Sequence, residues 1–149
     1  MADEKSAVIF ITFLLAMIGY AGMTIVILLS LKNKIPFLLW HVVTTVVLTH
    51  VIMVWTYRYG WQFSYSVRNG YSGFIIFHTA LLIILISNAA RKKALFLIRL
   101  SFLIVTMGAV GASFRYEIVE IYRIPVILCA ATGCGGLIWN YIQNKNKNV

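Results

Sequence analysis

Long apolar runs without a charged residue constrain the fold of this chain more than any other feature of its sequence. A transmembrane helix needs about 20 consecutive apolar residues to cross the hydrocarbon core of a bilayer. The run from Ala7 to Leu31 contains no charged residue and is longer than that. It also exceeds the roughly 7–15 apolar residues of a cleavable signal peptide, and no strongly basic segment precedes it. We therefore expect this run to stay on the protein as a membrane span.

The composition argues against an ordinary soluble domain. Apolar residues make up 61% of the sequence and charged residues only 11%, whereas a soluble domain carries about 25% charged residues. A chain of 149 residues has too little interior to hide so much apolar surface from water, so we expect the lipid bilayer to solvate it. The net charge of +9 does not indicate nucleic-acid binding, because the basic residues cluster at the ends of apolar runs.

Five apolar segments are predicted to span the membrane. They cover residues 7–31, 36–57, 73–90, 94–114 and 124–141. Pro36 and Pro125 stand at helix starts, where the missing backbone donor costs nothing. Arg99 interrupts the fourth segment and the fifth is rich in glycine, so an alternative with four spans stays open. The sequence thus predicts an all-α integral membrane protein, a single domain over residues 1–149 built as a bundle of five, or else four, transmembrane helices.

The distribution of basic residues predicts the orientation, because lysine and arginine are enriched in cytoplasmic loops. The side of the N-terminus holds all the acidic residues and these basic residues: Lys5, Arg58, Arg68, Arg115 and Arg123. The opposite side holds no acid and more basic residues: Lys32, Lys34, Arg91, Lys92, Lys93, Arg99, Lys145 and Lys147. We expect a multi-pass protein of a plasma-type membrane, with its N-terminus outside and its C-terminus in the cytoplasm.

Histidines inside the predicted spans are the first functional candidates, because intramembrane ionisable residues are rare and usually functional. His50 and His78 lie on consecutive antiparallel spans, roughly 10 Å and roughly 8 Å from the outer boundary at about 1.5 Å per residue. Imidazole pairs bind haem iron or contribute to metal sites, so this pair is a candidate site for haem b or a copper-type metal ion. Further candidate ligands are Met53, Glu117 and Glu120. The alternative is that the two imidazoles only form hydrogen bonds with neighbouring protein groups.

Other polar residues in the spans have simpler expected roles. His41 lies on the opposite face of the second span from His50, and we expect it to be hydrogen-bonded in a helix contact. Cys129 and Cys134 match neither a paired motif nor a disulfide framework, and we expect them to be small packing residues. No nucleophile stands beside a base and no glycine-rich phosphate loop occurs. We therefore do not expect the chain to be catalytic by itself.

The loop between the second and third spans is crowded with aromatic side chains. They are Trp55, Tyr57, Tyr59, Trp61, Phe63, Tyr65 and Tyr71. Part of this set forms the interfacial belt of a membrane protein, but tyrosine and tryptophan are also preferred anchors of protein interfaces. From Trp55 to Tyr65 every second residue is aromatic, which is a strand-like alternation. We expect a short hairpin or extended cap on the extracytoplasmic face, where it binds a partner.

Two further patterns occur near the last two spans. The charged residues around the last outer loop are typical of a solvated loop with ion pairs at helical spacing, and a substrate or proton site is the alternative. They are Arg115, Glu117, Glu120 and Arg123. Small residues four apart let helices approach closely, within the bundle or against another subunit. The pairs are Gly108 with Ala112, Ala131 with Gly135, and Thr132 with Gly136.

These features favour a small accessory or structural subunit of a membrane-bound multisubunit complex. The complex would be of a respiratory or metal-dependent redox type, such as an oxidase or monooxygenase, and the partners would be larger membrane subunits and the lipid bilayer. The predicted spans leave little of these 149 residues for an extramembrane domain, the predicted outer side is rich in interface-type aromatics, and we expect no complete catalytic set. A haem b or metal-binding electron-transfer protein that uses His50 and His78 is the second hypothesis. A transporter or channel component is the third, and the lack of acidic residues in the predicted spans disfavours it.

Overall fold

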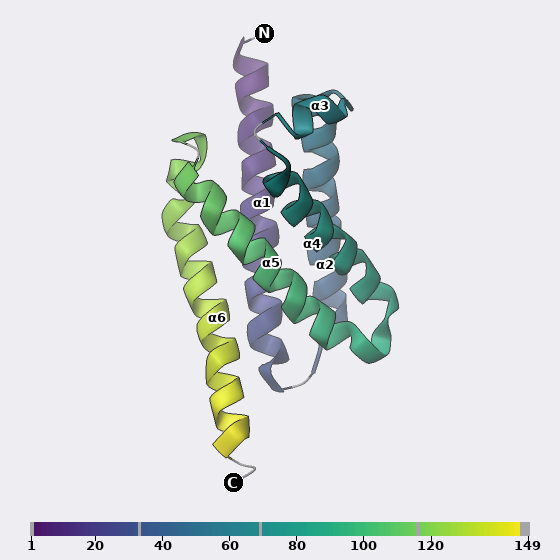
Figure 1. The fold of residues 1–149 in the computed structure, drawn as a ribbon, viewed down its shortest axis with the longest axis vertical. Helices are drawn as coiled ribbons and strands as arrows, with labels where there is room; N and C mark the ends of the chain where they lie inside the picture. Colours follow the sequence, from purple (N-terminus) through teal and green to yellow (C-terminus); the bar gives the residue numbers. More distant parts are fainter. Residues whose placement is uncertain (1, 33, 69, 116, 147–149) are drawn as a thin grey trace.

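The computed structural model describes residues 2–32, 34–68, 70–115 and 117–146 (Figure 1). Nearly all of these residues are helical, and none of them lies in a strand. Within the described ranges, five helices are long and apolar enough to cross a membrane. The prediction of an all-α membrane bundle is confirmed, and the version with five such helices replaces the one with four.

The long helices are α1 (Ala2–Leu29), α2 (Phe37–Met53), α4 (Tyr71–Ala89), α5 (Ala94–Arg115) and α6 (Arg123–Asn146). Short helical pieces extend or connect them: η1 (Ser30–Lys32), η2 (Val54–Tyr59), α3 (Phe63–Ser66), η3 (Arg91–Lys93) and η4 (Glu117–Tyr122). The membrane-length stretches begin and end close to the predicted boundaries, except that the last runs from Val119 to Asn146. It is therefore longer at both ends than the apolar segment that predicted it.

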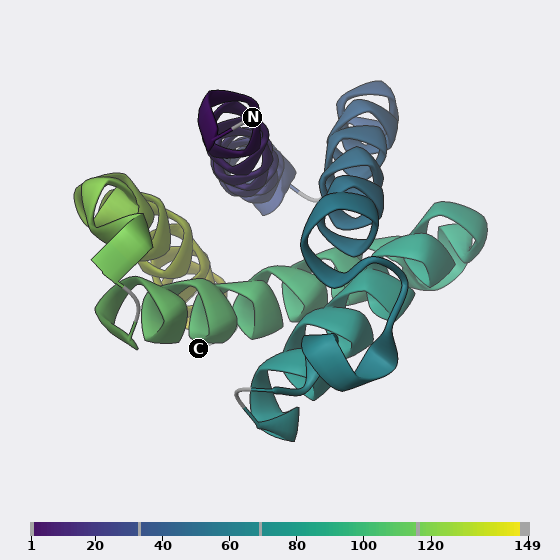
Figure 2. The ribbon, with the colours of Figure 1, turned by 90° about the horizontal axis from the view of Figure 1, so that it is seen from above.

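The helices form two sets that differ in tilt. α1, α2 and α6 run along the long axis of the molecule, whereas α4 and α5 form an antiparallel hairpin that is tilted across them (Figure 1). Seen from above, α1 lies between α2 and α6, and α5 runs across one side of this row, in the lower part of the picture (Figure 2). The N- and C-termini lie at opposite ends of the bundle, as an odd number of spans requires (Figure 1).

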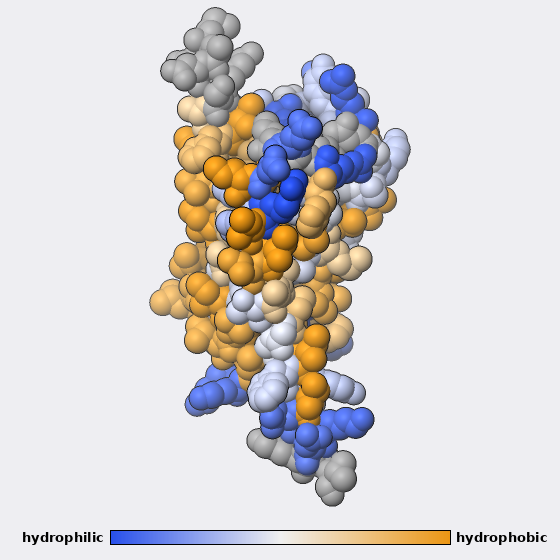
Figure 3. Space-filling model, turned by 90° about the vertical axis from the view of Figure 1, so that its left-hand side faces the viewer, coloured by the Kyte–Doolittle hydropathy of each residue, from blue (hydrophilic) through white to orange (hydrophobic). Residues whose placement is uncertain are grey.

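The surface has the banded pattern of a protein that crosses a bilayer. Apolar side chains form a broad middle zone, and hydrophilic side chains gather toward the two ends (Figure 3). Large apolar residues such as Ile25, Leu82 and Met107, from inside α1, α4 and α5, are about half exposed or more, which suits solvation by acyl chains rather than water. The fold therefore fits a multi-pass membrane protein.

The core lies where α1 and α5 cross, with α2, α4 and α6 packed around them. Its fully buried side chains include Met23, Ile27, Trp40, Ile84, Ile98 and Phe102. Two side-chain hydrogen bonds join α2 to α4: Trp40 Nε1 donates to Ser87 Oγ (2.9 Å) and Asn88 Nδ2 donates to Thr44 Oγ1 (3.1 Å). Such bonds, together with close packing, hold helices together in lipid, where the hydrophobic effect between helices is absent.

Glycines set the closest helix contacts, and they settle which small-residue pairs face inward. A Cβ on Gly108 would lie 2.8 Å from Phe77 of α4, and one on Gly136 would lie 3.0 Å from Leu28 of α1. A Cβ on Gly133 would overlap the ring of Phe102 in α5. Gly135, in contrast, has nothing within 4 Å of its Cβ position. Gly108 and Gly136 therefore pack within the bundle, whereas Ala131, Thr132 and Gly135 are exposed on α6.

The expectation of a hairpin or extended cap after the second span is wrong. The chain continues from α2 into a π-helical segment, η2, then reverses direction at Gly60 and Trp61, which both have left-handed backbone angles (φ 53° and 59°). The short helix α3 follows. The alternation of aromatic residues therefore comes from two helical pieces on either side of a turn, and not from the pleat of a strand.

Candidate functional site

A large, partly open cavity lies among the helices on the side of the aromatic loop. Its volume is about 930 Å³, and α1, α2, η2, α4, α5 and η4 all contribute to its lining. Pockets of about 300–1,000 Å³ bury most of the surface of a drug-sized ligand. Along α4 the lining extends from Ser72 to Ile84, which is roughly 18 Å at 1.5 Å per residue. The cavity therefore runs from the membrane boundary toward the middle of the bundle.

The wall of the cavity is apolar along most of this length. Its side chains come from four helices and include Met17, Val47, Ile76, Leu81 and Val105. Gly73 and Gly111 also line the cavity, and a Cβ at either position would meet nothing within 4 Å. The wall offers hydrocarbon contacts and few hydrogen-bonding groups, so it suits an apolar ligand segment.

The outer end of the cavity is basic. Arg58, Arg68 and Arg115 line it, and no acidic side chain is among the described residues of the lining. Arg58 comes from η2, where its guanidinium lies 6.0 Å from the centre of the Tyr59 ring. The rare π-helical winding of η2, which is frequent at functional sites, places Trp55, Arg58 and Tyr59 together on the lining.

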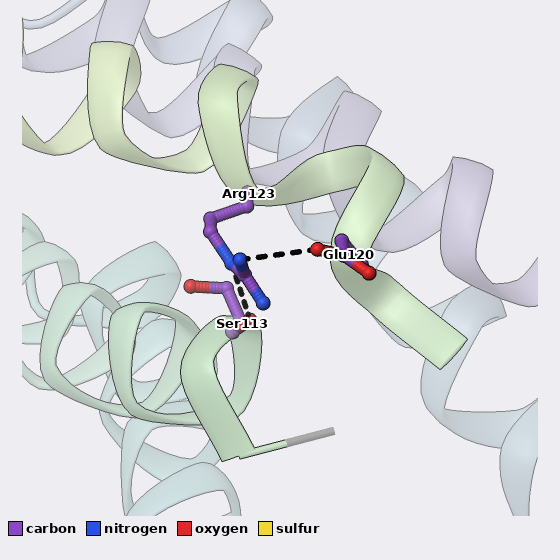
Figure 4. A network of polar contacts seen from close by, with 3 residues as sticks. All are labelled: Ser113, Glu120 and Arg123. Carbon is purple, nitrogen blue, oxygen red and sulfur yellow. Dashed lines mark hydrogen bonds and ion pairs between the residues drawn. The ribbon is translucent and has the colours of Figure 1, made fainter. Parts of the chain in front are cut away.

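The acidic residues of this side lie elsewhere. Glu117 is exposed, and Glu120 pairs with Arg123 (3.2 Å). Figure 4 shows the Arg123 side chain between Glu120 and Ser113, and its Nε also donates to the Ser113 carbonyl (3.2 Å). This contact ties the start of α6 to the end of α5. The predicted ion pair at helical spacing is confirmed for Glu120 and Arg123, and it has a structural role.

His50 and His78 both line the cavity. His50 Nδ1 donates to the Thr12 carbonyl of α1 (2.7 Å), which ties α2 to α1. His78 Nδ1 donates to the Phe74 carbonyl (2.8 Å), and its Nε2 accepts a hydrogen bond from Trp55 Nε1 (3.2 Å). Both ring nitrogens of His78 are therefore engaged, so iron or copper ligation would require the Trp55 bond to break.

No group of three or more histidine, cysteine or acidic side chains is arranged to hold a metal ion in the ranges that the structure covers. Haem or copper binding at His50 and His78 thus stays a prediction that rests on these two side chains. Cys129 and Cys134 are free, and both pack against the core. This is the packing role that was expected of them.

The aromatic residues that were predicted to form a partner interface divide into two groups. Trp55 packs against Tyr59 (ring centres 5.7 Å apart) and Trp61 (5.8 Å), and it lies at the inner side of the loop. Tyr59 is likewise only partly exposed, whereas five of the set are at least half exposed: Tyr57, Trp61, Phe63, Tyr65 and Tyr71. These exposed rings offer a surface at the membrane boundary, and partner binding there stays a prediction.

His41 is exposed on α2 and faces away from the other helices of this chain. Its Nδ1 donates to the Phe37 carbonyl of its own helix (2.6 Å), so contact with a helix of another chain stays a prediction. Thr45 and Thr49 follow at helical spacing, and each donates to the carbonyl four residues before it. These three exposed side chains form an outward polar stripe. Residues four apart lie on the same face of a helix, so the spacing of His41, Thr45 and Thr49 in the sequence already indicates this stripe.

No family model, curated protein or solved structure gives a significant match to this chain. The fold and the apolar middle zone define a multi-pass helical membrane protein. Any more specific function therefore has to be argued from the residues that line the cavity and from those that face outward.

Proposed function

We propose that this chain is a small accessory subunit of a larger membrane-bound complex, and that α2 docks against a neighbouring subunit through the outward polar stripe His41–Thr45–Thr49. This stripe is the observation that carries the proposal. It runs from roughly 6 Å to roughly 18 Å past the start of α2 at Phe37, at 1.5 Å per residue. Most of it thus lies at the depth of the hydrocarbon core.

Polar side chains at that depth normally face protein or water, because lipid cannot satisfy them. The two threonine hydroxyls use carbonyls of their own helix as acceptors. The imidazole of His41 has a second ring nitrogen, Nε2, with no hydrogen-bond partner among the described residues. A partner helix that supplies a donor or acceptor would remove this cost, and interhelical bonds of this kind promote association in membranes.

The outer face of α6 supports the same proposal. Ala131 and Gly135 are exposed there, and Gly135 is open to the surroundings. Small residues at this spacing let a neighbouring backbone approach closely. Because α2 and α6 lie on either side of α1 (Figure 2), a chain of this shape has two separate faces for neighbours. That arrangement suits a subunit that bridges or shields larger partners.

The respiratory or metal-dependent redox setting rests on His50 and His78 alone. The electron-transfer alternative needs both imidazoles as ligands, and His78 already uses both of its nitrogens within the chain. The accessory role requires no such rearrangement, so the contacts favour it.

Site-specific photo-crosslinking in native membranes tests the proposal. A photoreactive residue in place of Thr45 is expected to give a discrete protein adduct. The same residue in place of Leu103, which is exposed on α5, serves as the matched control and is expected to give only lipid adducts. Lipid adducts alone at both positions would contradict the proposal, as would an adduct with twice the 16.9 kDa mass of the chain, because that would indicate self-association.

Purification in mild detergent provides a second readout. The wild-type chain is expected to elute with larger subunits, and replacement of His41 and Thr45 by leucine is expected to release it. A wild-type chain that elutes alone as a monomer from native membranes would contradict the accessory role.

A further inference from the structure

The cavity combines two chemistries at its two ends, and this combination points to the class of its ligand. The inner part, which reaches Met23 and Ile84, is apolar and deeply buried. The outer part carries arginine, tyrosine and serine side chains. A ligand that fits both ends has a hydrocarbon segment of up to roughly 18 Å and a polar head at the membrane boundary.

The charge at the outer end specifies the head group. Arg58, Arg68 and Arg115 contribute positive charge, and the described lining contains no carboxylate. Guanidinium groups match phosphate oxygens with paired hydrogen bonds. A cationic or zwitterionic head would gain less here than an anionic one. These arginines also lie on the less basic side of the bundle, where the rule that places basic residues in the cytoplasm does not account for them.

Hydroxyl groups complete the polar end. Tyr59 and Tyr65 line the cavity beside the arginines, and Ser66 and Ser72 come from the loop and the start of α4. The hydroxyls of Tyr59, Tyr65 and Ser72 can donate to the oxygens that arginine does not reach, whereas the Ser66 hydroxyl donates to the Phe63 carbonyl (2.7 Å). The stripe on α2 that carries the proposed docking role is not part of this lining, so the two sites are independent.

We infer that the cavity binds an anionic phospholipid, with its phosphate between Arg58, Arg68 and Arg115 and an acyl chain along the apolar wall of α4 and α5. Free phosphate would gain nothing from the apolar wall, and a neutral hydrocarbon would gain nothing from the arginines. The bilayer supplies molecules that carry both parts. The bound lipid would fill the space that the tilted α4–α5 hairpin leaves beside α1 and α2.

Native mass spectrometry of the delipidated chain with added phosphatidylglycerol tests this inference. The double variant R58Q/R68Q is expected to bind the lipid at least tenfold more weakly than the wild type. The matched control K92Q/K93Q removes the same charge at the opposite end of the bundle, where both lysines are exposed, and it is expected to bind like the wild type. Equal losses in both variants would overturn the inference, because they would indicate a nonspecific charge effect.

Two further measurements separate the cavity from a simple anion site. Phosphatidylcholine is expected to bind the wild type more weakly than phosphatidylglycerol and to respond little to R58Q/R68Q. Inorganic phosphate is expected not to displace the bound lipid, and displacement at equal concentration would overturn the inference.

A steric variant tests the apolar part. Gly111 lines the cavity with open space at its Cβ position, so Gly111→Phe is expected to fold and to lower lipid binding at least tenfold. A thermal unfolding curve of each variant checks the fold. Unchanged lipid binding in a folded Gly111→Phe variant would exclude the cavity as the site.

Discussion

Replacement of Gly133 by alanine is expected to weaken the packing of α6 against α5. Gly133 is buried, and a Cβ there would overlap the ring of Phe102. That ring is itself fully buried and stacks against Tyr20 with ring centres 5.9 Å apart. Phe102 therefore has little freedom to move aside, so the helices must separate or the ring must leave its preferred rotamer.

The magnitude follows from two opposing effects. Overpacking of a well-packed core costs about 1–3 kcal/mol, and the confined ring places Gly133→Ala near the upper end. Alanine also favours the helix over glycine by up to about 1 kcal/mol. The net loss in the free energy of unfolding is thus about 2 kcal/mol, which is more than a tenfold change in the folding equilibrium.

Gly135→Ala is the matched control, because Gly135 lies two residues further along α6, on roughly the opposite face, and has open space at its Cβ position. In Gly135→Ala only the helix preference of alanine over glycine applies, so the free energy of unfolding of this variant is expected to be unchanged or slightly higher. Reversible unfolding in mixed detergent micelles measures both variants. Equal stability of the two variants would refute the packing argument. Recovery in the double variant Gly133→Ala/Phe102→Leu would show that the two side chains interact directly.

Three further predictions test other parts of the structure. Trp40→Phe removes the bond to Ser87 and leaves a gap in the core, so it is expected to lower the free energy of unfolding by about 1–3 kcal/mol. Trp139→Phe at an exposed position is expected to have little effect. Similar losses in both variants would contradict the role of this bond. A cysteine at Ser64 is expected to react with an impermeant maleimide outside intact cells, and one at Lys145 only after permeabilisation; the reverse pattern would contradict the orientation predicted from basic residues. The purified chain is expected to lack a Soret band, and a band that disappears in His50→Ala would instead support the haem alternative.

The membrane spans were predictable because a bilayer imposes a local rule. Each helix must be apolar over a fixed length, so its existence can be read without knowledge of its neighbours. The same reasoning placed His50 and His78 at one depth, and both line one cavity. It failed after Trp55, where the aromatic alternation suggested a strand. Periodicity does not reveal where a chain turns, and the turn at Gly60 and Trp61 changed the structure that the pattern described.

The cavity itself was not predictable from local patterns. It exists because the α4–α5 hairpin is tilted relative to α1 and α2 (Figure 1), and tilt is set by packing contacts such as those of Gly108 and Gly133. In the sequence, Arg58 and Arg68 served only as topology signals, and Arg115 was assigned to the charged last outer loop. Their shared position at the outer end of the cavity emerges only when helices far apart in the sequence are brought together.

The outward stripe and the inner cavity have the same physical origin. In lipid, helices gain little from burying apolar surface against one another, so a bundle stays compact only where close packing and hydrogen bonds favour it. This chain places such contacts between α2 and α4 and between α5 and α6, and leaves His41 outside and an open space inside. A neighbouring helix would supply a hydrogen-bond partner for His41, and an anionic lipid would fill the open space inside the bundle. A chain with both features is therefore expected to be most stable inside a larger assembly that retains its lipid.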